Sequence, residues 1–141
     1  MFIDIKKIEK LIAGQDVAFI SSIDEDGYPN TKAMLKPRQR DGIKIFYFST
    51  NTSSLRVDQY RKDPKACLYF YHKGLINYQG VMLKGTMEVL EDMAIKKALW
   101  KMGDQIFYSK GVTDPDYCVL KFTAVQGRYY NNLKTENFSL A

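Results

Sequence analysis

The chain has 141 residues, of which 45% are hydrophobic and 26% are charged. This length and composition are typical of one globular domain, residues 1–141, and exclude a disordered or low-complexity protein. No apolar run approaches the roughly 20 residues of a membrane helix, and the first residues lack the pattern of a secretory signal, so we expect a cytoplasmic protein without a membrane partner. The net charge of +5 suits either a nucleic acid or a phosphate-bearing cofactor.

The first half of the chain is predicted to form a helix followed by hairpins. Asp4 and Gly14 are placed to cap and to end a helix whose apolar residues recur at helical spacing: Ile5, Ile8, Leu11 and Ile12. Three strands are expected after it, at residues 17–23, 28–36 and 43–48. Turns at 24–27 and at Asp41-Gly42 join these strands, and Pro29 places the second strand at a sheet edge.

The second half continues the same pattern. A short helix over 54–61 is predicted to end before Asp63-Pro64, and a second helix to run from Glu91-Asp92 to a stop at Gly103. Further strands are expected at 66–71, 81–90 and 117–130, and the polar tail after Asn131 is expected to pack on a surface. Six strands joined mainly by hairpins predict a mainly β fold, a six-stranded antiparallel barrel with helical caps.

Hydrolytic and metal chemistry find little support in the sequence. His72 is the single histidine, and no nucleophile signature flanks it. Cys67 and Cys118 lie in strand-like runs without a C-x-x-C pair, which indicates buried reduced thiols rather than a disulfide. We expect no metal site, because one histidine and two separated cysteines do not make a ligand set.

Residues 46–56 are the most informative stretch. A strand runs directly into a helix through small polar residues, and Arg56 follows one turn into that helix. A helix N-terminus offers unpaired N–H groups, the serine hydroxyls add donors, and an arginine can grip a phosphate with two nitrogens. Lys32 on the neighbouring hairpin could supply a second cation. The alternative is an ordinary capped helix with a solvated arginine.

Several motifs in the same order resemble the pyridoxamine 5′-phosphate oxidase-related family of FMN-binding split barrels. They are Asp26-Gly27-Tyr28-Pro29, Lys32-Ala33-Met34, the segment from Phe48 to Arg56, Asp63-Pro64-Lys65-Ala66, Val81-Met82-Leu83-Lys84-Gly85 and Asp114-Pro115-Asp116-Tyr117. The chain is most similar to the short general-stress and flavin reductase-like members.

This resemblance implies a homodimer that holds FMN in a groove between its two subunits. It implies that Lys32, Ser54 and Arg56 bind the phosphate, with Leu55 inside the phosphate turn. It also places a second set near the isoalloxazine ring or the ribityl chain: Met34, Phe48, Ser49, Thr50 and Gln79. Trp100 could stack on the ring or on a substrate from the partner subunit, or lie in the helix core.

The sequence departs from the oxidase pattern in two places. Leu55-Arg56 stands where the oxidases have adjacent Arg-Lys, and the segment 127–133 does not match their substrate-gripping C-terminus. We therefore expect an FMN-dependent oxidoreductase that acts on another small molecule, with a reduced nicotinamide as donor. Because the flavin ring itself stores electrons and hydride, such a protein needs no acid–base pair of its own.

Other functions are compatible with parts of the same sequence pattern. The protein could bind or store flavin without turnover, or hold a deazaflavin or haem in the same barrel. A nucleic-acid-binding barrel would use the basic charge and the ten tyrosines as a stacking platform. We disfavour nucleic acid as a partner because the aromatic residues alternate with apolar ones inside the strands, as a core requires.

Overall fold

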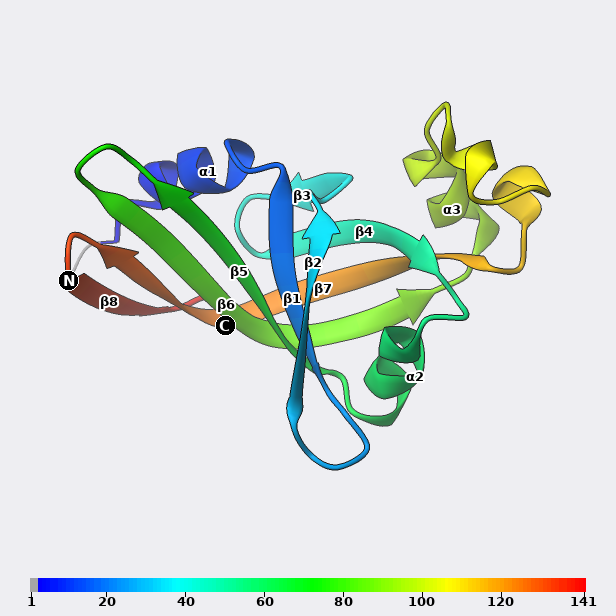
Figure 1. Ribbon diagram of the computed structural model, residues 1–141, viewed down its shortest axis with the longest axis horizontal. Coiled ribbons are helices and arrows are strands. Elements are labelled where there is room, and N and C mark those ends of the chain that lie inside the picture. The colour runs from blue at the N-terminus through cyan, green and yellow to red at the C-terminus, as the bar shows by residue number, and fades with distance from the viewer. Residues whose placement is uncertain (1–2) are drawn as a thin grey trace.

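An antiparallel sheet rolled around an apolar core forms the body of the protein (Figure 1). The computed structural model describes residues 3–141. The strands are β1 (Val17–Ile23), β2 (Pro29–Leu35), β3 (Gln39–Asp41), β4 (Ile45–Asn51), β5 (Lys65–Lys73), β6 (Tyr78–Leu90), β7 (Tyr117–Asn131) and β8 (Lys134–Ser139). Their order is β2-β1-β5-β6-β7-β4-β3, and β8 pairs with β7. The expected mainly antiparallel barrel is confirmed, with eight strands rather than six.

The length of β7 divides the sheet into two parts. Its first half pairs with β4, from Tyr117 opposite Asn51 to Thr123 opposite Ile45. Its second half pairs with β8 along the same edge, from Gln126 to Asn131. β6 follows the other edge along its whole length, with a register shift between Lys84 and Gly85. β4 and β8 thus follow one another along the same edge of β7, which divides the sheet as in a split barrel.

The inward face of the strands forms one core. In β1, Ala18 and Ile20 are buried while Phe19 between them is 40% exposed, which is the alternation of a sheet with one covered face. Phe46 lies at the centre of this core, with its ring centroid 5.8 Å from Phe70 and 6.2 Å from Phe122. The predicted alternation of apolar and polar side chains therefore corresponds to the inward and outward faces of the strands.

Two of the predicted helices form as expected. In α1 (Ile5–Ala13), Asp4 caps the first turn and Gly14 follows the last, and the helix packs against β5 and β6. In α2 (Leu55–Lys62), Ser54 is the N-cap and Asp63 is the C-cap. None of the helices within residues 3–141 is long and apolar enough to span a membrane.

The sequence prediction missed two strands. β3 has three polar residues, so no apolar alternation marks it; its backbone pairs with β4 across the predicted turn at Asp41-Gly42. β8 lies in the tail that was expected to pack on a surface. Asn132 and Leu133 take positive φ values of 51° and 66°, which make a tight hairpin turn after β7. The Asn131-Asn132 pair was a turn signal for this hairpin.

The second long helix is shorter than predicted. α3 spans Met93–Leu99, and Trp100 already has an extended backbone with ψ of 133°. The predicted end at Gly103 is wrong, because Gly103, at φ of 100°, begins a separate turn, η1 (Asp104–Ile106). A second turn, η2 (Gly111–Thr113), precedes β7. The helix ends where Trp100 packs against Tyr108 and Tyr117, although apolar residues at helical spacing had predicted that it continues to Gly103.

Candidate functional site

The turn from β4 into α2 places Arg56 inside the protein. Arg56 is only 8% exposed, and its Nη2 donates a 3.1 Å hydrogen bond to Thr50 Oγ1. Its Nε is buried and has no partner among the described residues. The ion pairs within residues 3–141 involve Arg38, Arg61 and Lys62, so no carboxylate of the described chain neutralises Arg56.

A buried guanidinium without a counter-charge is costly, and an anion at this position would remove that cost. The start of α2 offers further donors, because the N–H groups of Leu55 and Arg56 have no acceptor within the part of the chain that the structure describes. Ser54 Oγ accepts from Val57 N and keeps its own proton to donate. The arrangement fits a phosphate group.

Asp116, which sequence reasoning did not assign to the site, holds the same turn in place. Its carbonyl oxygen accepts from Thr52 N at 2.7 Å, and its carboxylate Oδ1 accepts from Ser53 N at 2.8 Å. These two N–H groups are therefore occupied, and the N–H of Ser54 donates to the carbonyl oxygen of Asn51, so the donors that remain are those of Leu55 and Arg56. The motif Asp114-Pro115-Asp116-Tyr117 was the signal that could have indicated this contact.

Contacts with β1 and β2 orient α2. Tyr60 donates from its hydroxyl to the carbonyl oxygen of Ser21 at 3.0 Å, and burial raises the pKa of Tyr60, so it stays protonated. Gln59 Oε1 accepts from Ser22 Oγ and, at 3.1 Å, from Asn30 Nδ2. α2 is thereby tied to the β1–β2 hairpin, with Arg56 one turn before these anchors.

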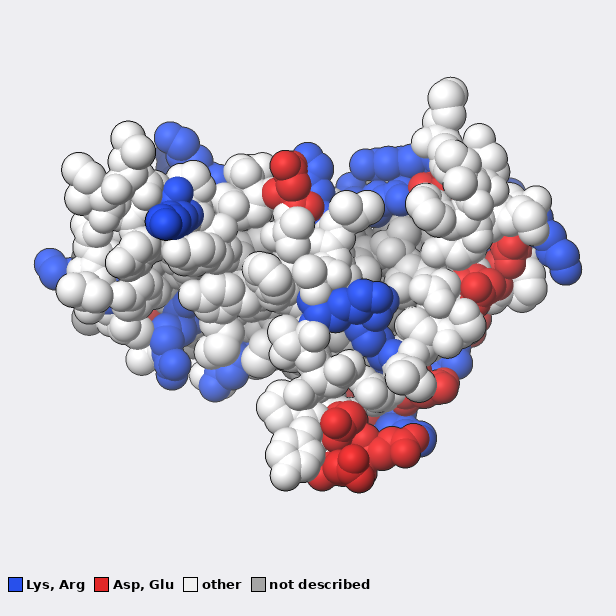
Figure 2. Space-filling model, viewed as in Figure 1, with Lys and Arg blue, Asp and Glu red and all other residues white. Residues whose placement is uncertain are grey.

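Lys32 and Met34 lie on the face of β2 that continues the core. Lys32 is opposite the buried Ile20 and Met34 is opposite the buried Ala18. Met34 is half-buried against the core, whereas Lys32 is exposed. Figure 2 shows basic side chains gathered between β2 and α2, with acidic side chains beyond them at the β1–β2 hairpin. The structure thus brings Lys32 and Met34 to the same side as Arg56.

The remaining residues predicted along β4 do not all face this side. Phe48 is buried in the core, so only its backbone is open to a ligand. Ser49 points to the opposite face, where its Oγ lies 3.4 Å from Tyr117 Oη. Leu55 is exposed at the start of α2. Within one protomer, the sequence prediction therefore combined residues from two sides of β4.

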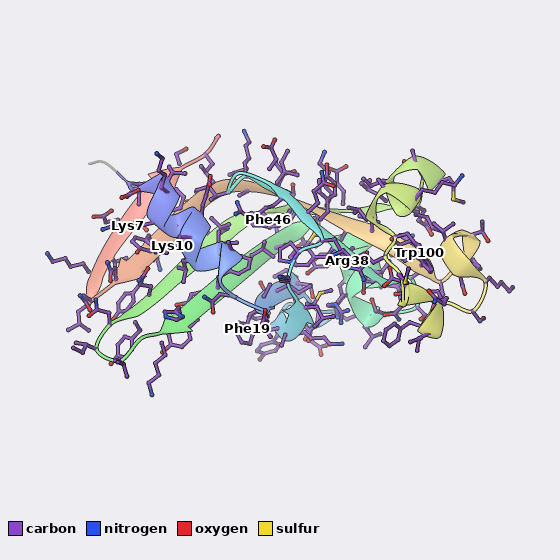
Figure 3. The ribbon with its side chains drawn as sticks, turned by 90° about the horizontal axis from the view of Figure 1, so that it is seen from above. Lys7, Lys10, Phe19, Arg38, Phe46 and Trp100 are labelled. Carbon is purple, nitrogen blue, oxygen red and sulfur yellow. The ribbon has the colours of Figure 1, made fainter. Side chains whose placement is uncertain are left out.

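Trp100 belongs to the cluster on that opposite side. Its ring centroid lies 5.0 Å from Tyr117 in an edge-on contact and 6.1 Å from Tyr108. Burial raises the pKa of Tyr108 to about 12. Arg38 lies next to this cluster (Figure 3) and forms a two-point ion pair with Asp104 at 2.8 and 2.9 Å. In the protomer Trp100 anchors α3, which is the core role that the sequence left open.

Gln79 lies far from Arg56 along the sheet. Its Oε1 accepts a 2.9 Å hydrogen bond from Tyr129 Oη, and it lines a hollow beneath α1. One protomer does not bring Gln79 together with the start of α2. His72, exposed near the end of β5, lines the same hollow.

The described residues contain no group of three or more His, Cys, Asp or Glu side chains that could hold a metal ion. Cys118 is buried, and burial raises the pKa of its thiol, so it carries little thiolate at neutral pH. Cys67 is half-buried and also free.

The family profile described as pyridoxamine 5′-phosphate oxidase like matches residues 4–140. The chain belongs to the pyridoxamine 5′-phosphate oxidase-like family. Among curated proteins, none matches the chain.

Solved structures support the same assignment. A Clostridium acetobutylicum protein related to general stress protein 26 is 41% identical, with a TM-score of 0.85 over 98% of this chain and 97% of that one. General stress protein 26 from Bacillus anthracis is 19% identical, with a TM-score of 0.76 over 96% and 98%. A heme binding protein from Mycobacterium smegmatis is 13% identical, with a TM-score of 0.76 over 99% of this chain and 59% of that one. The last two similarities show a shared split-barrel fold.

Proposed function

We propose that this protein binds FMN, with Arg56 and the first turn of α2 holding the phosphate. The observation that carries this proposal is the buried guanidinium of Arg56, which meets one hydroxyl and no carboxylate of the described chain. Thr50 and the hairpin anchors of α2 hold this cation in place before a ligand arrives. Preorganised donors of this kind lower the cost of binding an anion.

The other groups on this side of the barrel would contact the remaining parts of the flavin. Lys32, exposed on β2, adds a second positive charge near the phosphate. Met34 supplies an apolar surface for the ring, and the backbone of β4 from Phe48 to Thr50 offers polar groups to its edge. A bound flavin would supply the electron and hydride chemistry. We propose that the protein is an oxidoreductase that accepts electrons from a reduced nicotinamide and passes them to a small molecule.

A second copy of the chain is the partner that this proposal requires. The outward face of β1, β2, β5 and β6 carries a continuous set of apolar side chains, in register across the strands: Val17, Phe19, Leu35, Tyr69, Tyr71 and Met82. Of these, Leu35 is 78% exposed. An exposed apolar face of this extent marks an interaction surface. Because β2 carries Lys32 and Met34 on its other face, a partner docked here would lie beside the proposed flavin site.

The first experiment is a visible spectrum of the purified protein, followed by titration with FMN and, in parallel, with riboflavin. We expect the two absorption bands of oxidised flavin, or their appearance on addition of FMN. A Soret band in their place would indicate haem. A colourless protein that takes up neither FMN nor riboflavin would contradict the proposal.

Arg56→Met tests the phosphate assignment. The substitution keeps an unbranched apolar stem and removes the charged guanidinium, so FMN affinity should fall about 10- to 100-fold, as expected for a lost charge-assisted contact. Riboflavin, which lacks the phosphate, should bind both proteins equally. Arg61→Met is the matched control, because Arg61 lies on the same helix and pairs at the surface with Glu91. Equal losses for FMN and riboflavin would place Arg56 elsewhere in the site.

Turnover is tested separately from binding. Anaerobic mixing of the FMN-loaded protein with NADH or NADPH should bleach the flavin bands. If FMN binds and neither donor bleaches it, the flavin is bound without a nicotinamide reaction, and the alternative of a storage or stress protein is supported.

A further inference from the structure

A hollow of about 560 Å³ lies between α1 and the ends of β5, β6 and β7. Its floor is a row of polar side chains in cross-strand register: His72 is opposite Gln79, and Gln79 is opposite Asn131. This row lies on the inward face of the sheet, where the core ends. The size is within the range of sites that take small molecules.

Positive charge faces this row from the helix. Lys7 and Lys10 are three residues apart and both line the hollow from α1 (Figure 3). None of the residues within 3–141 that line it carries a carboxylate side chain. Asp4 and Glu136 line an adjoining hollow, which also contains Lys134 and shares Lys7, Tyr129 and Asn131 with the main one. Asp4 already caps α1 through Lys7 N. Among the described residues that line the main hollow, Lys7 and Lys10 carry the charge, so the helix side of the hollow favours an anion, while Asp4 and Glu136 act from the adjoining one.

The floor also contains hydrogen-bonding groups without partners. Asn131 Oδ1 is buried and accepts no hydrogen bond from the described residues. A buried acceptor in this state costs free energy that a hydroxyl donor would recover. Tyr129 donates to Gln79 Oε1, and its raised pKa, caused mainly by burial and further by Asp4 and Glu136, keeps it protonated. This contact leaves the NH₂ group of Gln79 as a donor.

We propose that this hollow is a second binding site, separate from the flavin site, for a phosphate monoester of a small polyol. Lys7 and Lys10 attract the phosphate as point charges, and a hydroxyl of the polyol donates to Asn131 Oδ1. The hollow lies on the opposite face of the sheet from Tyr69 and Tyr71, because these alternate with the inward-facing Phe70 and His72 in β5. Docking of a second copy on the apolar face would leave it open.

Binding is measured by calorimetry and by amide chemical shifts, with ribose 5-phosphate, ribose and inorganic phosphate as probes and the full chain saturated with FMN. We expect ribose 5-phosphate to bind more tightly than inorganic phosphate and ribose not to bind. The shifted amides should cluster at residues 7–15, 72–79 and 129–131. The absence of binding by ribose 5-phosphate and phosphate at millimolar concentration would overturn the proposal.

Two double lysine variants distinguish phosphate binding in the hollow from attraction of the phosphate to the basic surface as a whole. Lys7→Gln combined with Lys10→Gln should weaken ribose 5-phosphate binding about tenfold or more. Lys6→Gln combined with Lys97→Gln removes the same charge from exposed positions outside the hollow and should leave binding unchanged. Equal losses in the two double variants would show attraction to the basic surface alone and overturn the site.

Two single variants test the remaining parts of the proposal. Asn131→Leu should abolish the preference for ribose 5-phosphate over inorganic phosphate, and an unchanged preference would refute the role of Asn131. Arg56→Met, measured without FMN, should leave ribose 5-phosphate binding intact. Its loss in Arg56→Met, with retention in the lysine double variant, would assign the phosphate to the flavin site instead.

Discussion

Gly85 occupies a point on β6 where the backbone of β7 leaves no room for a side chain. A Cβ built there would lie 1.9 Å from the carbonyl oxygen of Thr123 and 2.8 Å from its carbon. The register of β6 against β7 shifts at this position, between Lys84 and Gly85. The close approach of the two strands accounts for the glycine, since backbone atoms cannot move aside as a flexible side chain can.

Gly85→Ala should therefore destabilise the protein by about 2 kcal/mol, the scale of an overpacked interior. The free energy of unfolding in urea measures this effect. Gly14→Ala is the control, because a Cβ at Gly14 meets its nearest atom at an ordinary 3.4 Å, and its stability should change by less than about 0.5 kcal/mol. Equal effects of the two substitutions would show that the approach of β7 to Gly85 is not the cause.

At the scale of elements, the ion pair of Arg38 and Asp104 joins the entrance of β3 to the segment after α3. Arg38 Nη1 also donates to the carbonyl oxygen of Leu99, and Asp104 Oδ2 also accepts from Lys101 N. These bonds explain why α3 ends at Leu99 and why the chain turns there. The hydrogen bonds from Arg38 hold the pKa of Asp104 below its usual range.

Asp104→Asn should lower the stability at neutral pH by about 2 kcal/mol, because it removes a hydrogen-bonded charge pair that is mostly shielded from water. The folded-state pKa of Asp104 is depressed, so its contribution is present above the unfolded pKa near 4 and is lost as the pH falls through the folded value. The difference between wild type and variant should accordingly shrink in urea titrations at low pH. Glu91→Gln, which breaks an exposed pair with Arg61, should change stability by less than about 0.5 kcal/mol.

At the scale of the whole molecule, one face of the sheet remains uncovered. Phe19 is exposed at the middle of this face (Figure 3), with Tyr69 directly opposite it on β5. The hydroxyl of Tyr69 lies over Gly80, since a Cβ at Gly80 would collide with it. The ring of Tyr69 therefore lies against the sheet, and with the exposed Phe19 beside it this face offers an apolar surface suited to a second copy.

Phe19→Asp should convert the proposed homodimer into a monomer, because it places a charge at the centre of an apolar interface. Light scattering coupled to size exclusion at micromolar concentration measures the mass. FMN affinity should fall in the same variant if, as proposed, the partner subunit completes the site. Leu133→Asp, at the exposed β7–β8 turn, is the control and should remain dimeric. A wild-type protein that elutes as a monomer and still binds FMN tightly would contradict the dimeric arrangement.

Much of the fold followed from local patterns. The α1 stripe, the Asp41-Gly42 turn and Pro29 at the start of an edge strand all appear where predicted. The misses have physical reasons. β3 consists of three polar residues that pair with β4 through the backbone, so no apolar alternation marks it. The helix ends at Leu99 because Trp100 packs on Tyr117 and Arg38 binds the carbonyl oxygen of Leu99, and both partners lie far away in the sequence.

For the site, local sequence identified the helix start and the arginine of the β4–α2 turn, because capping residues and a cation one turn into a helix are neighbours along the chain. Tertiary structure alone decided that Arg56 is buried with no carboxylate among residues 3–141 paired to it, and that Asp116 occupies the N–H groups of Thr52 and Ser53. It also decided that Ser49 and Trp100 lie on the other side of β4 from Arg56. It also brought His72, Gln79 and Asn131 together beneath Lys7 and Lys10. Periodicity fixes which residues share a face of one element, whereas the partners that satisfy a charge or an amide depend on which elements the fold places side by side.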